Sequence, residues 1–281
     1  MIGIVIVNFG DPARTIRFVR EECAKVAAEH SVVVVDNGGA ESSTELLQKG
    51  LGSDAVVLPA GGNLGFARGN NLGADHAIKE FGADLLLFVN NDIVFTDADV
   101  VDRLAARLKE LPDAGMIGPK VVGLDGRLQS PEPFKSFAVQ HLLPYWGKLF
   151  MGRDALREKL MTDYAQTAGE GPHYRLMGSF MLMRSADFKA CGGMDPNTFL
   201  YAEEAILSER LKKIGKEVWY DPSVQVLHEH GATIDSHYGR VRKRRMRLES
   251  DAYYYKTYIG LPPFQYAAAR VTYALKALFG R

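Results

Sequence analysis

Three polar residues, Asn90, Asn91 and Asp92, directly follow an uninterrupted apolar run at residues 85–89. Five apolar residues in a row are typical of a strand that is buried on both faces of a parallel sheet. Such a strand brings the residues after it to the carboxyl edge of the sheet, where open α/β folds bind their ligands. A carboxylate at this edge can hold a hard divalent cation, and the cation can hold phosphates. The alternative is that these residues only form the turn and cap before the next helix.

Similar polar groups follow three other strand-like runs. They are Asn8 after residues 2–7, Asp36-Asn37 after residues 31–35, and the loop 61–71 after residues 55–58. Because sequential parallel strands point their carboxyl ends the same way, we expect these groups to share one crevice with Asp92. Each group alone is ordinary turn chemistry. Four such groups at one edge of a sheet predict a ligand site.

The loop reads Gly-Gly-Asn-Leu-Gly-Phe-Ala-Arg-Gly-Asn-Asn-Leu-Gly over residues 61–73. It lacks the Gly-x-Gly-x-x-Gly spacing of dinucleotide-binding folds and the Gly-Lys-Ser/Thr ending of a P-loop, so neither fold is expected. Its small residues would let a ligand approach the backbone, and its three asparagines offer amides for hydrogen bonds. The alternative is a place where a helix packs closely on the sheet.

Glu203 and Glu204 stand at the start of a predicted helix, directly after Phe199-Leu200-Tyr201. One of them could serve as a general base beside an aromatic-lined cleft. Two carboxylates in a first helical turn also complement the helix dipole, which would be a sufficient structural reason for them.

His228 follows the predicted strand 224–227. A single histidine at a strand end is more often a hydrogen-bonded structural residue than a ligand. It becomes a candidate metal ligand only if the fold brings it near Asp92.

These residues are set in a chain of alternating strand and helix patterns, which predicts an α/β fold with a mainly parallel sheet covered by helices. The expected strands are 2–7, 31–35, 55–58, 85–89, 114–122, 174–183, 218–220 and 224–227. The expected helices are 12–26, 43–48, 65–81, a helix including 101–111, a short one capped by Ser185, and one from about 203 to 215. Periodicity fades over residues 129–172, which suggests either a flap that binds an acceptor or an ordinary surface excursion.

The composition excludes several classes of protein. Of 281 residues, 47% are hydrophobic and 24% charged, as in ordinary globular proteins. Lys+Arg and Asp+Glu both number 34, so net charge gives no argument for nucleic acid binding. The two cysteines, Cys23 and Cys191, lack metal-site spacing and fit a reducing compartment. No signal peptide or run of about 20 apolar residues is evident, so we expect a cytoplasmic protein.

Residues 236–281 differ in character from the rest of the chain. Six basic residues (Arg240, Arg242, Lys243, Arg244, Arg245 and Arg247) precede Tyr253-Tyr254-Tyr255 and an aromatic-rich final helix. The basic run is either a solvated face or a surface that contacts an anionic membrane. The helix could equally pack on a second copy of the chain. RNA binding is not expected, since no recognition motif accompanies the run.

Taken together, the motifs resemble the family 2 glycosyltransferases of GT-A fold, and most closely their bacterial rhamnosyltransferase-like branch. The resemblance covers roughly Ile2 to Asp235. It is carried, in order, by residues 4–9, 34–37, 63–71, 90–92, 178–182, 192–195, 199–204 and 228–233. It implies a catalytic domain at 1–235, with a nucleotide-binding half at about 1–125 and an acceptor-side half at about 126–235, followed by a helical extension at 236–281.

The resemblance also implies a role for each candidate residue. Asp36 would receive the base, Asp92 would bind Mg²⁺ or Mn²⁺ with His228 close to the same ion, and Glu204 would be the catalytic base with Glu203 beside it. The nucleotide pocket would be completed by Asn8, Asn63, Gly65, Phe66, Asn70, Asn71 and Asn91. Two positions depart from the family pattern: Asn90 replaces the first acid of its Asp-x-Asp motif, and Ile206 replaces an acid two residues beyond the base.

The implied function is inverting transfer of a sugar, with rhamnose the candidate, from a dTDP- or UDP-sugar to a hydroxyl of a glycan or lipid-linked acceptor in bacterial surface polysaccharide synthesis. Such an enzyme would act in the cytoplasm, with peripheral contact at the inner face of the plasma membrane through residues 240–281. One alternative is an inactive sugar-nucleotide-binding or scaffold protein, favoured by Ile206. Another is a sugar nucleotidyltransferase, which would need a Gly-rich loop with Arg and Lys where this chain has Asn8-Phe9-Gly10-Asp11.

Overall fold

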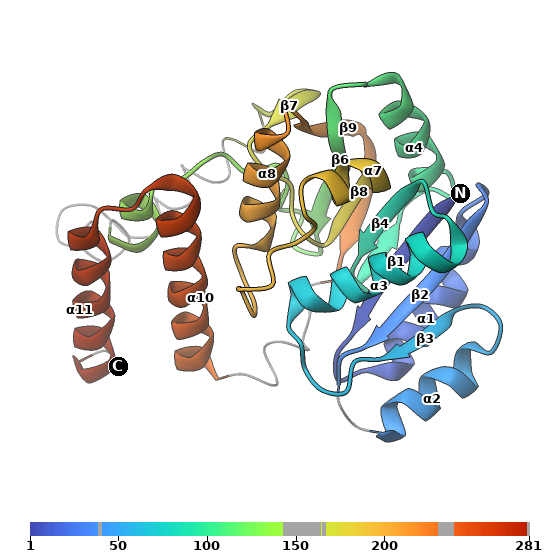
Figure 1. Ribbon diagram of the computed structural model, residues 1–281, viewed down its shortest axis with the longest axis horizontal. Helices are drawn as coiled ribbons and strands as arrows, with labels where there is room; N and C mark the ends of the chain where they lie inside the picture. Colours follow the sequence, from blue (N-terminus) through green and yellow to red (C-terminus); the bar gives the residue numbers. More distant parts are fainter. Residues whose placement is uncertain (39–40, 143–163, 165–166, 230–238, 280–281) are drawn as a thin grey trace.

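The computed structural model describes residues 1–38, 41–142, 164, 167–229 and 239–279 (Figure 1). Within these residues, nine strands form one sheet in the order β3-β2-β1-β4-β8-β6-β9-β5, and β7 pairs with β9. The strands are β1 (Ile2–Asn8), β2 (His30–Asp36), β3 (Val56–Pro59), β4 (Leu85–Val89), β5 (Ile93–Phe95), β6 (Ala114–Gly123), β7 (Gly171–His173), β8 (Phe180–Arg184) and β9 (Glu217–His228).

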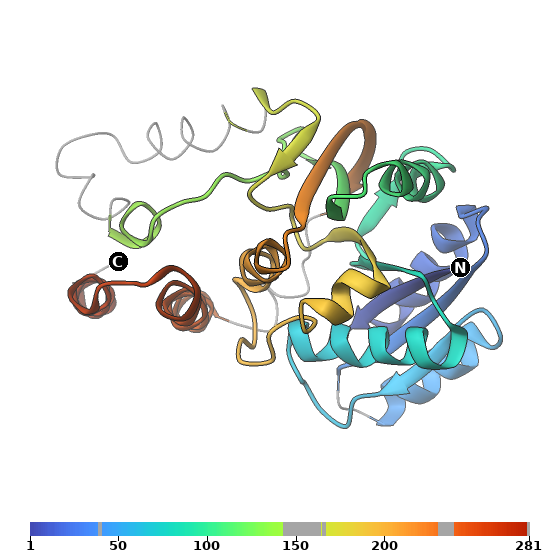
Figure 2. The same cartoon turned by 45° about the horizontal axis from the view of Figure 1, so that its top comes forward.

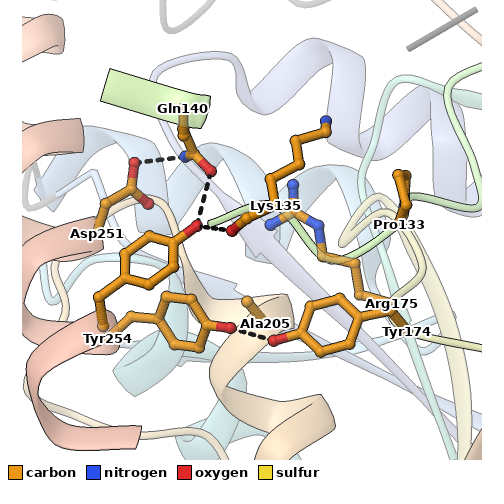
Figure 3. A pocket seen from close by; sticks show the side chains of 9 residues that line it. Pro133, Lys135, Gln140, Tyr174, Arg175, Ala205, Asp251 and Tyr254 are labelled. Atoms are coloured by element: carbon orange, nitrogen blue, oxygen red, sulfur yellow. Dashed lines mark hydrogen bonds between the residues drawn. The ribbon is translucent and has the colours of Figure 1, made fainter. Parts of the chain in front are cut away.

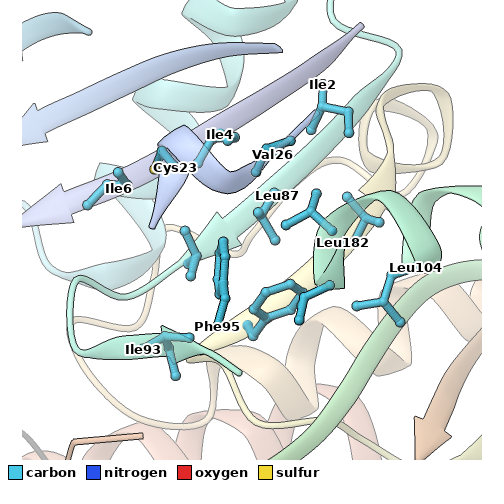
Figure 4. Close-up of a cluster of buried hydrophobic side chains, with 14 of the residues drawn as sticks. Ile2, Ile4, Ile6, Cys23, Val26, Leu87, Ile93, Phe95, Leu104 and Leu182 are labelled. Carbon is cyan, nitrogen blue, oxygen red and sulfur yellow. The ribbon is translucent and has the colours of Figure 1, made fainter. Parts of the chain in front are cut away.

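Helices cover both faces of the sheet, as the alternating pattern predicts. The helices are α1 (Pro12–Glu21), α2 (Glu41–Leu51), α3 (Phe66–Phe81), α4 (Val100–Glu110), α7 (Ser185–Ala190) and α8 (Glu203–Lys213). Side chains of α1, α2 and α4 pack on one face of the sheet, and Figure 4 shows part of this layer, with Ile4 of β1, Leu87 of β4 and Leu104 of α4. The other face is covered by α3, α7 and α8.

The first four strands of this order, β3-β2-β1-β4, are all parallel, so their carboxyl ends lie at one edge. The side chains of β1, β2 and β4 are mostly apolar and buried, as expected for strands covered on both sides, whereas those of β3 are partly buried or exposed. In the other half β8 runs antiparallel to both β4 and β6, and β5 and β7 run antiparallel to β9. The sheet is therefore parallel over β3, β2, β1 and β4 and mixed over the remaining strands.

Helix α3 lies unusually close to β1, because small residues line its inner face. An added Cβ on Gly73 would stand 2.4 Å from a methyl carbon of Val5, and one on Gly69 would stand 3.2 Å from Val7. The alternative given for the Gly-rich loop, close packing of a helix on the sheet, therefore describes these two glycines.

Several predicted boundaries are wrong in informative ways. The strands predicted at 218–220 and 224–227 are one bent strand, β9, whose register against β6 shifts after Asp221. The strand predicted from Tyr174 begins only at Phe180, and the first predicted helix ends at Glu21, followed by a short 3₁₀ turn at Cys23–Lys25. Ser185 does not cap α7: it is the first helical residue, and its hydroxyl donates to the carbonyl of Ala83 at 2.5 Å.

The C-terminal extension is helical, as predicted. It consists of α10 (Arg240–Tyr254), a π-helical turn η4 (Tyr255–Ile259) and α11 (Pro263–Phe279), and the two helices lie side by side next to α8 (Figures 1 and 2). In the described residues, no helix has both the length and the apolar composition that crossing a bilayer requires.

Of the predicted insertion 129–172, the structure describes only the two ends. The first end carries a π-helical turn, η2 (Ala138–Leu142), and the second carries β7. The aromatic residues Tyr145, Trp146 and Phe150 lie outside the described residues, as do residues 230–233 of the last motif.

Candidate active site

The carboxyl ends of β1 and β2 hold a buried chain of polar side chains. Asn8 pairs with Asp36 in register, and its amide donates to the Asp36 carboxylate at 3.0 Å. The hydroxyl of Thr15 donates to Asn8 at 2.7 Å, and the amide of Asn91 donates to Thr15 at 2.7 Å. The structure therefore brings together Asn8, Asp36 and Asn91 as predicted, and adds Thr15 as the link between them.

Asp36 is held in place from α2 as well. Its carboxylate accepts hydrogen bonds from Ser43 at 3.1 Å and from Thr44 at 2.6 Å. These donors follow a turn rather than a strand, and no regular spacing in the sequence indicates them.

Asn37 positions the loop that begins at Asn63. Its side chain donates to the Asn63 side chain at 3.1 Å and to the Gly65 carbonyl at 3.2 Å, and it accepts from the Leu64 amide at 2.7 Å. Gly65 has a φ of +81°, and a Cβ there would stand 2.3 Å from the carbonyl oxygen of Phe199. The loop is thus shaped by its own chain before any ligand binds.

The other predicted pocket residues of this segment, Phe66, Asn70 and Asn71, lie in the first two turns of α3 and contact protein. The Phe66 amide donates to the Phe199 carbonyl at 3.0 Å, and the buried Asn70 donates to the Phe66 carbonyl at 3.0 Å. Asn71 exchanges two hydrogen bonds with the backbone of Met194, at 2.8 and 2.9 Å. The structure places all three at the carboxyl edge, where their side-chain and backbone groups fix the position of the loop.

Asp92 and His228 lie next to each other because β5 and β9 pair. Residues 93–95 form a short strand rather than the start of a helix, and Ile93 is opposite His228 in the ladder. The Nε2 atom of His228 is 3.3 Å from Oδ1 of Asp92, and its Nδ1 atom lies 2.7 Å from Oε1 of Gln129. The condition set for His228 as a metal ligand, proximity to Asp92, is therefore met.

The surroundings of Asp92 fit a divalent cation. Its Oδ1 atom is buried and makes no hydrogen bond to the described residues, and the imidazole of His228 at 3.3 Å is its nearest partner. A buried carboxylate oxygen without hydrogen bonds is costly, and a cation would offset that cost. Within the described part of the chain, no group of three or more His, Cys, Asp or Glu residues could hold a metal. Mg²⁺ is commonly bound by one or two carboxylates and completes its shell with phosphate and water, so Asp92 is the ligand that would hold it, with the imidazole of His228 beside it.

Glu204 faces the segment that leads into β8. Its Oε1 atom accepts a hydrogen bond from the Gly178 amide at 3.2 Å, and a Cβ on Gly178 would stand 2.7 Å from the same oxygen. The next residue, Ser179, accepts through its carbonyl from the Asn90 amide at 3.0 Å. Only two residues therefore separate the candidate base from the turn that carries Asp92.

Glu203 points elsewhere and is buried. One of its carboxylate oxygens has no hydrogen-bond partner. Burial, and then the charges of Glu204 and Asp251, raise the pKa of Glu203 well above its ordinary value. A residue enclosed in this way is less suited than Glu204 to meet an acceptor hydroxyl.

Helix α8 begins on a strained turn. Tyr201 and Ala202 both have positive φ, at 78° and 69°, which non-glycine residues rarely adopt. Such strain costs on the order of 1–3 kcal/mol for each residue and is typical of functional sites. It aims the first turn of α8, and with it Glu204, at Gly178.

Ile206, the departure from the family pattern, is fully buried in an apolar cluster between α8 and the C-terminal helices. Its neighbours in the cluster include Leu248, Ala252 and Tyr255. An acid at this position would be a buried charge among apolar side chains. The isoleucine instead packs against the apolar side chains of the C-terminal extension.

Behind α8 lies a second polar cluster that the sequence did not indicate (Figure 3). Arg175 donates to Glu132 at 2.5 Å, and Glu132 also accepts from Lys135 at 3.1 Å. Burial alone would lower the pKa of Arg175, but Glu132 and then Glu204 raise it. The cavity beside these residues holds about 10 Å³, enough for one water molecule and too little for a sugar ring.

The burial of Glu203 predicts an unusual pH dependence of stability. Because the folded state raises its pKa, the folded protein binds a proton more tightly than the unfolded chain, and stability falls as pH rises above the ordinary value of 4.5. Glu203→Gln should therefore raise the free energy of unfolding at pH 8 by about 1–3 kcal/mol, with little change at pH 5. Thermal unfolding at both pH values measures this, with the exposed Glu217→Gln as the control. Equal destabilisation at both pH values would contradict it.

Comparisons with known proteins show which family the chain is similar to. The chain is 27% identical over 243 residues to N-acetylglucosaminyl-diphospho-decaprenol L-rhamnosyltransferase of Mycobacterium tuberculosis, covering 81% of this chain and 76% of that protein. It is 23% identical over 235 residues to the rhamnosyltransferase WbbL of Escherichia coli K12, covering 81% and 83% of the two chains. Its fold is similar to GalNAc-T7, solved with UDP, GalNAc and Mn²⁺, with a TM-score of 0.61, 13% identity, and coverage of 82% of this chain and 44% of that one.

The family model described as "Glycosyltransferase like family 2" matches residues 2–248, which is most of the chain. The matched region contains the polar strand ends, the loop 63–71, Asp92, Glu204 and His228. The chain belongs to the glycosyltransferase-like family 2.

Proposed function

We propose that this glycosyltransferase is a metal-dependent inverting enzyme that moves rhamnose from a nucleoside-diphosphate sugar to a hydroxyl of a lipid-linked glycan acceptor. The observation that carries the proposal is the short path between two carboxylates. Glu204 accepts a hydrogen bond from the Gly178 amide, and the neighbouring Ser179 carbonyl accepts one from Asn90 in the turn of Asp92. One carboxylate can then act on the acceptor and the other on the leaving diphosphate. Rhamnose as the sugar rests on the two rhamnosyltransferases to which the chain is similar.

On the donor side, Asp36 offers a carboxylate at the end of β2. Uracil and thymine both present an N–H donor on the edge that a carboxylate can accept, so UDP and dTDP both fit. Hydrogen bonds from Asn8, Ser43 and Thr44 hold the carboxylate in place. Because the Asp36 carboxylate is already held in place, it does not lose conformational freedom when the nucleotide binds.

Asp92 and His228 would hold Mg²⁺ or Mn²⁺. Bound there with the donor, the ion would stabilise the charge that develops on the departing nucleoside diphosphate. The protein's own contribution is the fixed geometry of the pair, set by the ladder of β5 and β9 and by a hydrogen bond from the Glu229 amide to the Asp92 carbonyl at 2.8 Å. Support for Mn²⁺ comes from GalNAc-T7, which carries this ion.

Glu204 would accept the proton of the acceptor hydroxyl as that oxygen attacks the sugar. The Gly178 amide orients one carboxylate oxygen, and Arg175 supplies a positive charge nearby. Direct attack on the sugar needs no covalent enzyme intermediate and gives inversion. Holding the two substrates in line supplies much of the remaining rate.

A lipid-linked acceptor would be met at a membrane surface, and the C-terminal helices offer such a contact. The arginines at 242, 244, 245 and 247 of α10 are exposed. On α11, Phe264 is 70% exposed and Val271 is 59% exposed, and they lie two turns apart on one face of the helix. Basic and apolar side chains together are the pattern that binds anionic lipid surfaces. The enzyme would then sit at the inner face of the plasma membrane.

Glu204→Gln should lower kcat by about 10²–10⁴-fold, because the amide cannot take the hydroxyl proton. Binding of UDP or dTDP with Mn²⁺, measured by calorimetry, should stay within about twofold of the wild type. The matched control is Glu209→Gln on the same helix. An unchanged kcat in Glu204→Gln would show that another group is the base, and a wild type that transfers or hydrolyses no nucleotide sugar would favour the inactive alternative.

Charge reversal on α10 tests the membrane contact. Arg244→Glu/Arg245→Glu should weaken co-sedimentation with vesicles containing anionic lipid by tenfold or more, since each basic residue contributes about 1 kcal/mol near such a surface. Lys79→Glu/Lys109→Glu, an exposed pair on α3 and α4, is the control and should bind like the wild type. If the wild type does not bind these vesicles and instead forms a dimer by sedimentation velocity, a second copy covers this face and the membrane proposal is wrong.

A further inference from the structure

Residues 194–202 form a strap between the loop 63–71 and the catalytic helix α8. At its start, the Met194 backbone exchanges two hydrogen bonds with Asn71. Further along, the Pro196 carbonyl accepts from Arg68 at 2.8 Å, and the Phe199 carbonyl accepts from the Phe66 amide. Four hydrogen bonds therefore join residues 66–71 to this strap.

The other side of the strap is held by the C-terminal extension, through Asp195. The Asp195 carboxylate accepts from the hydroxyl of Tyr253 at 2.9 Å and from that of Tyr258 at 2.5 Å, and it forms an ion pair with Arg210 at 3.1 Å. Five residues along, the Leu200 carbonyl accepts from the Ser250 hydroxyl at 2.8 Å. Helix α10 and the turn η4 are thus hydrogen-bonded to the strap at Asp195 and at Leu200.

Asp195 can occupy this place only because its donors are present. The residue is 2% exposed, and a buried carboxylate without partners is strongly unfavourable. Burial alone would raise the pKa of Asp195, but hydrogen bonds from Tyr258, Asn197 and Tyr253 outweigh it and hold the pKa below its ordinary value. The carboxylate is therefore charged and tightly bonded, which makes it a rigid point of attachment.

The bonds of the extension form two separate groups. Tyr253 and Tyr258 bond Asp195 in the strap, and Tyr258 also accepts from Arg210 of α8 at 3.0 Å. Tyr254 bonds the hydroxyl of Tyr174, and Tyr255 bonds the backbone carbonyl of Lys135 and, at 3.2 Å, the Gln140 side chain. The second group attaches the extension to the molecule without touching the strap, so the first group is not needed merely to dock the helices.

We infer that Tyr253, Tyr258 and Asp195 are positioning residues for the donor site: through the strap, the C-terminal extension holds the loop 63–71 in the form that binds the nucleotide. The inference rests on the proposed function, since it takes that loop as part of the donor site. It gives the extension a role in donor binding, although no residue of α10 or η4 needs to touch the donor.

The test compares two double variants that each remove two hydroxyl groups from the same extension. Tyr253→Phe/Tyr258→Phe removes the bonds to the strap, together with the one bond from Arg210 of α8 to Tyr258. Tyr254→Phe/Tyr255→Phe removes only bonds outside the strap. The dissociation constants for UDP and dTDP, each with Mn²⁺, are measured by calorimetry, and thermal unfolding gives the stability of each variant. Tyr258→Phe alone serves if the first double variant does not fold.

We expect both double variants to lose stability, but only the first to bind the nucleotide about tenfold more weakly. Equal affinities in the two variants, at or near the wild-type value, would overturn the inference while leaving the proposed function intact. Equal weakening in both would also overturn it, because the effect would follow general loosening of the extension. A wild type that binds neither nucleotide would instead refute the proposed donor site itself.

Discussion

The pairing of β4 with β8 is the constraint on which the candidate site depends. β4 is the last strand of the parallel half, and its end carries Asp92; β8 is the first antiparallel strand, and the residues before it face Glu204. The hydrogen bond from the Asn90 amide to the Ser179 carbonyl extends this pairing by one step beyond the strands. The boundary between the parallel and mixed parts of the sheet is therefore the place where the two proposed catalytic carboxylates, Asp92 and Glu204, come close together.

Around this boundary, several polar side chains are buried or partly buried. Asn8, Thr15, Asp36 and Asn91 are acceptable because each makes hydrogen bonds within the group. Two carboxylates differ: Asp92 and Glu203 each keep a buried oxygen without a hydrogen-bond partner. The first lies beside His228, where a cation fits. The second belongs to the first residue of α8, where burial raises the pKa of the carboxyl group.

Much of the donor half was predictable from the sequence, because local patterns determine it. Buried apolar runs followed by polar residues identify parallel strand ends, and parallel topology alone places Asn8, Asp36 and Asp92 at one edge. The contact between Asp92 and His228 was not predictable in this way. It depends on the pairing of a three-residue strand with a bent strand far along the chain, and neither the shortness of β5 nor the bend of β9 is visible in residue periodicity. The need for glycine at 178 and for isoleucine at 206 likewise arises only from three-dimensional packing.

The central claim is that Asp92 anchors a divalent cation on the path to Glu204. Crystals grown with Mn²⁺ and UDP, measured at the manganese absorption edge, test it most directly, because the anomalous signal locates the ion independently of the protein density. We predict one strong peak bonded to the Asp92 carboxylate, with His228 beside it and the diphosphate of the nucleotide on the same ion. A bound nucleotide with its manganese held by other residues, and with Asp92 bonded to neither, would contradict the account.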